Sequence, residues 1–86
     1  MKFQGAVIKE QDTVFAIVVV KMHIVNNSNE ANNTINSFSP LFPGMPVVLM
    51  AQNFTGRPKY YGRNDIVRFL VNIPIHAIPW QEYTVS

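Results

Sequence analysis

A short basic and aromatic segment, GRPKYYGR at residues 56–63, is the part of this chain most suggestive of chemistry. It holds three of the seven Lys and Arg residues and two of the three tyrosines. In an extended strand, alternate side chains share a face, so the basic groups and one tyrosine would form a patch. Cations that contact phosphates and rings that stack on bases are what a nucleic-acid surface requires. The candidate basic surface consists of Arg57, Lys59, Tyr61, Arg63 and Arg68.

The same segment also fits an edge strand, and this is our first interpretation. Charged side chains on an edge strand discourage pairing with a second sheet, and Pro58 has no N–H to donate to a neighbouring strand. Binding of a protein partner or of nucleic acid is the alternative use of this surface. Nucleic-acid binding is not favoured.

Residues suited to catalysis or metal binding are few. The chain has no cysteine, and its two histidines, His23 and His76, do not have the spacing of a zinc site. The five acidic residues fall in an expected turn, in first turns of expected helices or near the C-terminus. No serine lies in a G-x-S-x-G elbow, and no glycine-rich phosphate loop is present. We therefore expect no catalytic residues, no metal, no cofactor and no enzymatic activity.

The composition predicts one folded domain over residues 1–86. The chain is 48% hydrophobic and 14% charged, so it can build a core, but it has few charges to cover its surface. Self-association is therefore expected. The net charge of +2 is a weak field for a dedicated nucleic-acid binder. Because the longest apolar run covers only residues 14–20, we expect no membrane partner and a cytoplasmic location.

The first third of the chain predicts a β-hairpin. Residues 3–9 and 13–25 are rich in Val, Ile and Phe, and a short polar break separates them. The second strand has one wholly apolar face, whereas its other face becomes polar at Lys21 and His23. This pattern predicts burial on both faces at first and on one face afterwards.

A change of period predicts a helix over residues 27–42. Apolar residues recur there at helical spacing, and Asn27 with Glu30 resembles a capping box. The helix is expected to break near Ser39, because two prolines and a glycine follow. The apolar stripe consists of Ala31, Ile35, Phe38 and Phe42.

The second half repeats the order of strand, strand and helix. Residues 45–52 predict a central strand, residues 57–61 an edge strand, and residues 64–73 a helix with Asn64 as its N-cap. Residues 74–86 are expected to form an extended C-terminal strap that ends in a short strand.

The predicted fold class is α+β, in the order β-β-α-β-β-α, with a mixed sheet of four or five strands. The two helices are expected to pack on one face of it. A helical crossover makes the second and third strands parallel. Residues 21–73, with Gly44-Met45-Pro46 before an apolar strand, Gly62 and a closing helix, resemble the back half of a thioredoxin-like domain. This resemblance implies a truncated thioredoxin-like topology as the alternative and no redox role, because the Cys-x-x-Cys pair is absent.

The most specific functional expectation is a homodimer. The second strand would extend well beyond the first, and an uncovered half-apolar edge favours a two-fold partner. The function expected from these patterns is a small non-catalytic interaction module that self-associates. Nucleic-acid binding through residues 57–68 is the alternative, and a small enzyme with its site at the dimer interface is the third possibility. The candidate interface consists of Lys21, Met22, His23, Ile24 and Trp80.

Overall fold

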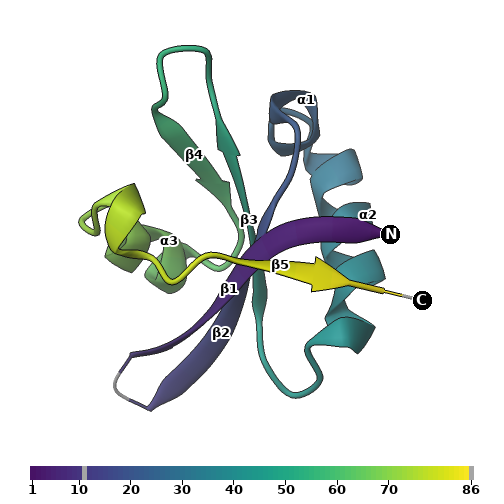
Figure 1. Cartoon of the computed structure of the whole chain (residues 1–86). Helices are drawn as coiled ribbons and strands as arrows, with labels where there is room; N and C mark the ends of the chain where they lie inside the picture. The colour runs from purple at the N-terminus through teal and green to yellow at the C-terminus, as the bar shows by residue number, and fades with distance from the viewer. Residues whose placement is uncertain (11, 86) are drawn as a thin grey trace.

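A computed structural model describes residues 1–10 and 12–85 and places them in one α+β domain (Figure 1). The predicted order is confirmed, including the short C-terminal strand, and one short helix, α1, is added. The elements are β1 (Lys2–Glu10), β2 (Thr13–Val19), α1 (Met22–Val25), α2 (Ser28–Phe38), η1 (Ser39–Leu41), β3 (Val47–Gln52), β4 (Pro58–Tyr61), α3 (Asn64–Leu70), η2 (Ile75–Ala77) and β5 (Gln81–Thr84).

The five strands form one mixed sheet in the order β4-β3-β2-β1-β5. β1 and β2 are antiparallel, β2 and β3 are parallel through the helical crossover, and β3 and β4 are antiparallel, all as predicted. β4 is an edge strand, as its proline indicated. The opposite edge is β5, which pairs antiparallel with β1.

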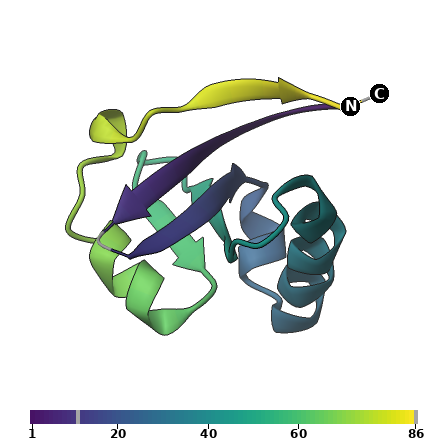
Figure 2. The same ribbon diagram turned by 90° about the horizontal axis from the view of Figure 1, so that it is seen from below.

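The helices cover both faces of the sheet, so the expectation that they share one face is wrong. β2 and β3 are buried on both faces, and each face therefore needs its own cover. α2 packs with Ala16 and Val18 on what we call the α2 face, whereas α3 packs with Phe15 and Ile17 on the α3 face. Figure 1 shows α2 and α3 on opposite sides of the central strands, and Figure 2 gives the view from below.

Residues 21–25 do not continue β2, contrary to prediction. The Val20 N–H donates the last bond to β3, at the Met50 carbonyl, and the chain then turns into α1. Val25 becomes fully buried on the α2 face, with Met22 and Ile24 packed beside it. The alternation of apolar residues suggested a strand, but burial beneath the crossover favours a helical turn over an unpaired extension.

The two main helices keep their predicted apolar stripes. At the start of α2, the Asn27 Oδ1 atom accepts the Glu30 N–H at 3.0 Å, which confirms the predicted cap. α2 ends at Phe38 and gives way to the 3-10 turn η1, close to the predicted break. α3 differs from prediction at its start, because Arg63 is the N-cap residue and Asn64 is already helical. The Arg63 side chain makes no capping hydrogen bond to the first turn of α3, so the predicted Asn64 cap is not replaced by another side-chain cap.

The C-terminal strap crosses the α3 face and ends as β5, as predicted. Ile78 is buried against the core, and the Trp80 indole N–H donates to the Ile75 carbonyl at 2.9 Å. The strap carries β5 to the side of β1, so that Met1 and Val85 exchange backbone hydrogen bonds. Within residues 1–10 and 12–85, no helix is long and apolar enough to cross a membrane.

Candidate functional site

The candidate basic surface is divided between the two faces of the sheet. Lys59 and Tyr61 point to the α2 face, where Lys59 Nζ donates to Asn26 Oδ1 and the Tyr61 hydroxyl donates to Asn32 Oδ1 at 3.3 Å. Arg68 instead lies in the last turn of α3, on the other face. The structure therefore brings Lys59 and Tyr61 together but separates Arg68 from them.

Arg63 is held by an ion pair beside α3. Its Nε and Nη2 atoms donate to Asp65 Oδ1 and Oδ2 at 2.8 and 2.6 Å. This bidentate pairing lowers the pKa of Asp65 to about 2 and raises the pKa of Arg63. Both side chains are more than half exposed, so the pair mainly fixes geometry and adds little stability.

Tyr60 occupies the α3 face of the sheet and is only 9% exposed. Its hydroxyl is buried and has no hydrogen-bond partner among the described residues. Burial raises the pKa of this phenol. Because Tyr60 is buried and Tyr61 is bonded to α2, neither ring offers the open platform on which a base stacks.

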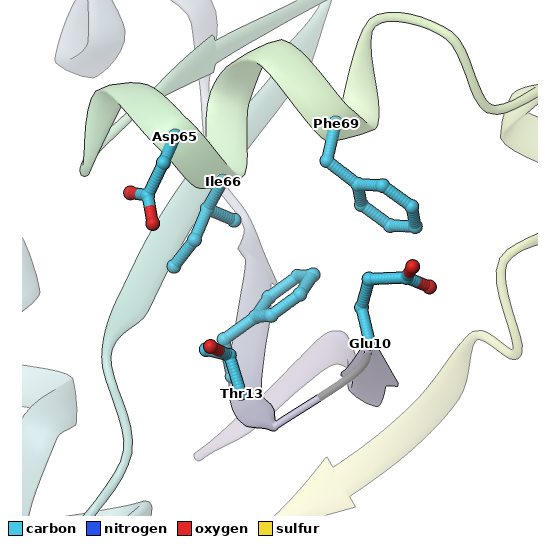
Figure 3. A pocket seen from close by; sticks show the side chains of 6 residues that line it. Glu10, Thr13, Asp65, Ile66 and Phe69 are labelled. Atoms are coloured by element: carbon cyan, nitrogen blue, oxygen red, sulfur yellow. The ribbon is translucent and has the colours of Figure 1, made fainter.

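A groove of about 270 Å³ lies between α3 and the end of the β1–β2 hairpin (Figure 3). Its carboxylates come from two walls, Asp65 on α3 and Glu10 at the end of β1, with Thr13 and the Phe69 ring beside them. A general acid or base works best with a pKa near the working pH, and Asp65 is far below that range. This arrangement does not favour acid-base catalysis.

The two histidines lie in different places. His76 lines a groove of about 230 Å³ with Trp80 and Gln52, and none of its described lining residues is acidic. The His23 Nε2 atom lies 4.0 Å from a Glu30 carboxylate oxygen, and both side chains are more than half exposed. In the described part of the chain, no three His, Asp or Glu residues are grouped closely enough to hold a metal ion.

The largest of these grooves, about 360 Å³, separates α2 from the end of β4. Tyr61, Gly62 and Arg63 form its β4 side, and Asn32 and Ile35 form its α2 side. It is open, and the Tyr61 hydroxyl and the Arg63 guanidinium are already bonded to protein groups. Tyr61 and Arg63 of the candidate basic surface thus line this groove, but the Arg63 charge is paired with Asp65.

The candidate interface residues are also separated. Met22 and Ile24 pack on the α2 face, whereas Trp80 packs against the α3 face. Lys21, which directly precedes α1, and His23, which lies on α1, are both exposed. The overhanging strand that was to make this interface does not form, so the argument for placing a dimer contact there no longer holds.

The free edge of the sheet lies at β5, whereas residues 21–25 form no strand. Met1 and Val85 exchange hydrogen bonds of 2.9 and 2.8 Å, and in an antiparallel pair such bonded positions alternate with unbonded ones. The N–H and C=O groups of Glu82 and Thr84 therefore point away from β1. β5 is the outer strand of the sheet, its described pairing is with β1, and both Glu82 and Thr84 are exposed.

Sequence reasoning missed two features of this surface. It expected a short last strand but not that this strand would be an edge, since strand order depends on the path of the strap. It also treated residues 53–56 only as a turn, although Phe54 is fully exposed there. A large aromatic residue inside a predicted turn was the available signal.

We compared the chain with protein families, curated proteins and solved structures. The chain matches no protein-family model, no curated protein and no solved structure.

Proposed function

We propose that this chain is a non-catalytic interaction module that forms a homodimer through the free edge of β5. The observation that carries the proposal is the outward direction of the Glu82 and Thr84 backbone groups on an exposed edge strand. Unpaired edges recruit further strands, and a two-fold partner with the same edge satisfies both copies.

The side chains of β5 support a symmetric pairing centred on Tyr83. In that register the backbone of Glu82 bonds Thr84 of the partner subunit, and the reverse pair forms as well, giving four new hydrogen bonds. No charge faces a like charge, because Glu82 lies opposite a threonine.

An aromatic row on the α2 face supports the same register. Tyr83 stacks on Phe3 with a centroid distance of 5.1 Å, and Phe38 and Phe42 contact Phe3 edge to face. With Tyr83 at the two-fold axis, the rows of the two copies would meet and exclude water from each other. β5 would then be covered both by backbone bonds and by apolar contact.

The non-catalytic part of the proposal is supported by the partners of three of the five acidic side chains. Asp65 is bonded to Arg63, Glu82 lies 3.8 Å from Lys2, and Glu30 stands beside His23 on the surface. A histidine oriented by a carboxylate is one arrangement that a shared acid-base site at the dimer interface could use, and residues 81–84 contain no histidine. The nucleic-acid alternative would need the basic residues on one face.

The test compares two substitutions at Thr84. Thr84→Pro removes the outward N–H without removing a bond to β1, whereas Thr84→Val keeps the N–H and the strand propensity. Wild type and Thr84→Val should sediment as dimers at about 200 micromolar, a concentration suited to a small interface, and Thr84→Pro should be monomeric. Circular dichroism checks that all three are folded.

A wild-type mass that stays at 9.8 kDa over this concentration range would refute self-association. A folded Thr84→Pro variant that still forms the dimer would refute the β5 interface.

A further inference from the structure

The tip of the β3–β4 hairpin presents an aromatic side chain to solvent. Phe54 is fully exposed, whereas Phe15 and Phe42 are buried and the other phenylalanines are at least half-buried. In Figure 1 this hairpin projects beyond the helices at one end of the molecule. We call residues 52–59 the hairpin arm.

The loop of the hairpin arm satisfies most of its polar groups internally. Asn53 Oδ1 accepts the N–H groups of Thr55 and Arg57, each at 3.0 Å, and the Thr55 hydroxyl at 2.6 Å. The Gly56 N–H donates to the Asn53 carbonyl, and the Gly56 carbonyl accepts from Gln52 Nε2 at 3.0 Å. These bonds satisfy polar groups of the loop that would otherwise bond to water.

Positive charge gathers near the base of the hairpin arm, on its α2 face. Arg57 and Lys59 lie on the arm itself, and Lys21 directly follows Val20, whose N–H bonds the end of β3. Lys59 is bonded to a neutral amide, at Asn26. In the described part of the chain, no carboxylate forms an ion pair with these three cations. The arm therefore combines one apolar tip with three cations near its base, Lys21, Arg57 and Lys59, which we call the collar.

We propose that the hairpin arm docks on the surface of an anionic lipid bilayer, with Phe54 inserted at the boundary between headgroups and acyl chains. Aromatic and basic residues together favour that boundary, and lipid phosphates complement the collar. A loop that enters an apolar region must satisfy its own backbone, as this one largely does. The expectation of no membrane partner rested on the lack of a spanning segment, which surface docking does not require.

The shape of the arm favours a bilayer over a nucleic acid. Single-stranded nucleic acid needs successive aromatic platforms along a basic groove, whereas the arm is convex and carries a single open ring. Tyr60 is buried beneath it, and Tyr61 is bonded to α2. One protruding ring with cations behind it suits a soft surface that closes around the ring.

The experiment measures sedimentation of the protein with two kinds of vesicle. One is pure phosphatidylcholine, and the other contains roughly 30% phosphatidylserine, which supplies the negative surface potential. Wild type should bind the anionic vesicles and bind the neutral ones at least tenfold more weakly, with about a fivefold loss for each cation removed. Phe54→Ala should weaken binding by about tenfold.

Two matched controls separate docking from general stickiness. Val71→Ala removes an exposed apolar residue elsewhere and should leave binding unchanged. Because the chain has a single tryptophan, Phe54→Trp in a Trp80→Phe background reports the depth of the tip directly. Its emission should shift to the blue with anionic vesicles, and lipids brominated on the acyl chain should quench it.

Three results would overturn the proposal. The first is no binding to anionic vesicles, and the second is binding that Phe54→Ala leaves unchanged. The third is retention of a single-stranded oligonucleotide that depends on Phe54 while vesicles do not bind, which would assign the arm to nucleic acid. None of these results bears on the β5 interface, which lies at the opposite edge of the sheet.

Discussion

The two edges of the sheet differ in what they offer to another strand. At β5 the outward positions are Glu82 and Thr84, and the N–H of each points away from β1 at the edge of the sheet. At β4 the Asn53 N–H bonds the Arg57 carbonyl, so by alternation the outward positions are Pro58 and Tyr60. Proline has no N–H, and the β4 edge therefore keeps only one of the two donors that the β5 edge has.

Charge separates the edges further. A two-fold pairing of β4 would be centred on Lys59 and would bring two lysines face to face, whereas the same pairing of β5 brings two tyrosines together. Lys59 and Pro58 are thus two devices against strand addition, on a strand of four residues. The comparison indicates that the sheet is protected at one edge and open at the other, which is the condition for a closed dimer.

The largest effect is expected from removing the protection at β4. Pro58→Thr with Lys59→Thr restores an outward donor and removes the facing charges, so both edges become competent to pair. We expect assemblies larger than a dimer, because a second open edge allows chains to add end to end. Sedimentation velocity measures the change.

Combining these substitutions with Thr84→Pro provides the control. That variant has an open β4 edge and a blocked β5 edge, and it should return to a dimer. If the Pro58→Thr, Lys59→Thr variant has the mass of the wild type, the two devices are not what keeps β4 unpaired.

A smaller effect, on the stability of the fold, is expected at Tyr60. Most substitutions in a core lower the free energy of unfolding, whereas this one should raise it. Its buried hydroxyl has no described partner, so Tyr60→Phe removes an unsatisfied polar group and should stabilise the fold by about 1 kcal/mol. Tyr61→Phe is the matched control, because its hydroxyl donates to Asn32, and it should be neutral or slightly destabilising. Urea unfolding measures both, and a destabilised Tyr60→Phe variant would mean that the hydroxyl makes a favourable interaction.

The smallest effect concerns the ion pair that follows β4. The Arg63 guanidinium lowers the pKa of Asp65 from 3.8 to about 2, so the native state favours the ionised carboxylate. The stability that the ionised Asp65 carboxylate contributes is fully present above pH 3.8 and is lost as the pH falls through about 2. Asp65→Asn should therefore be less stable than wild type at neutral pH, and the difference should disappear near pH 2.

The control for this pH dependence is Arg63→Gln. In that background, Asp65→Asn should produce little pH-dependent change, because the partner that lowers the pKa is gone. A difference between wild type and Asp65→Asn that is constant from neutral to acid pH would place the effect in helix geometry and not in the ion pair.

Much of this architecture could be predicted from local patterns. The β1–β2 hairpin, the stripe of α2 and the edge position of β4 follow from periodicity and from the placement of proline. Asn27 acts as the predicted cap because capping is a local interaction. These features depend on residues that are neighbours in the sequence or share one element.

The predictions that were wrong concern features that depend on contacts between distant segments. Residues 21–25 alternate like a strand, yet β2 ends at Val19 and residues 22–25 form α1, which buries Val25 on the α2 face. The side of the sheet that α3 covers depends on how the chain crosses from β4 to β5. For the same reason, the open edge could not be assigned until the strand order was known.

Amide hydrogen exchange of Glu82, Thr84 and Tyr60, measured by NMR at a series of protein concentrations, tests the central claim most directly. If two copies meet at β5, the Glu82 and Thr84 amides should become protected as concentration rises, because each gains a carbonyl partner. The outward Tyr60 amide of β4 should exchange at a rate that does not depend on concentration. Exchange at Glu82 and Thr84 that is independent of concentration, or protection that rises at Tyr60 instead, would contradict the account.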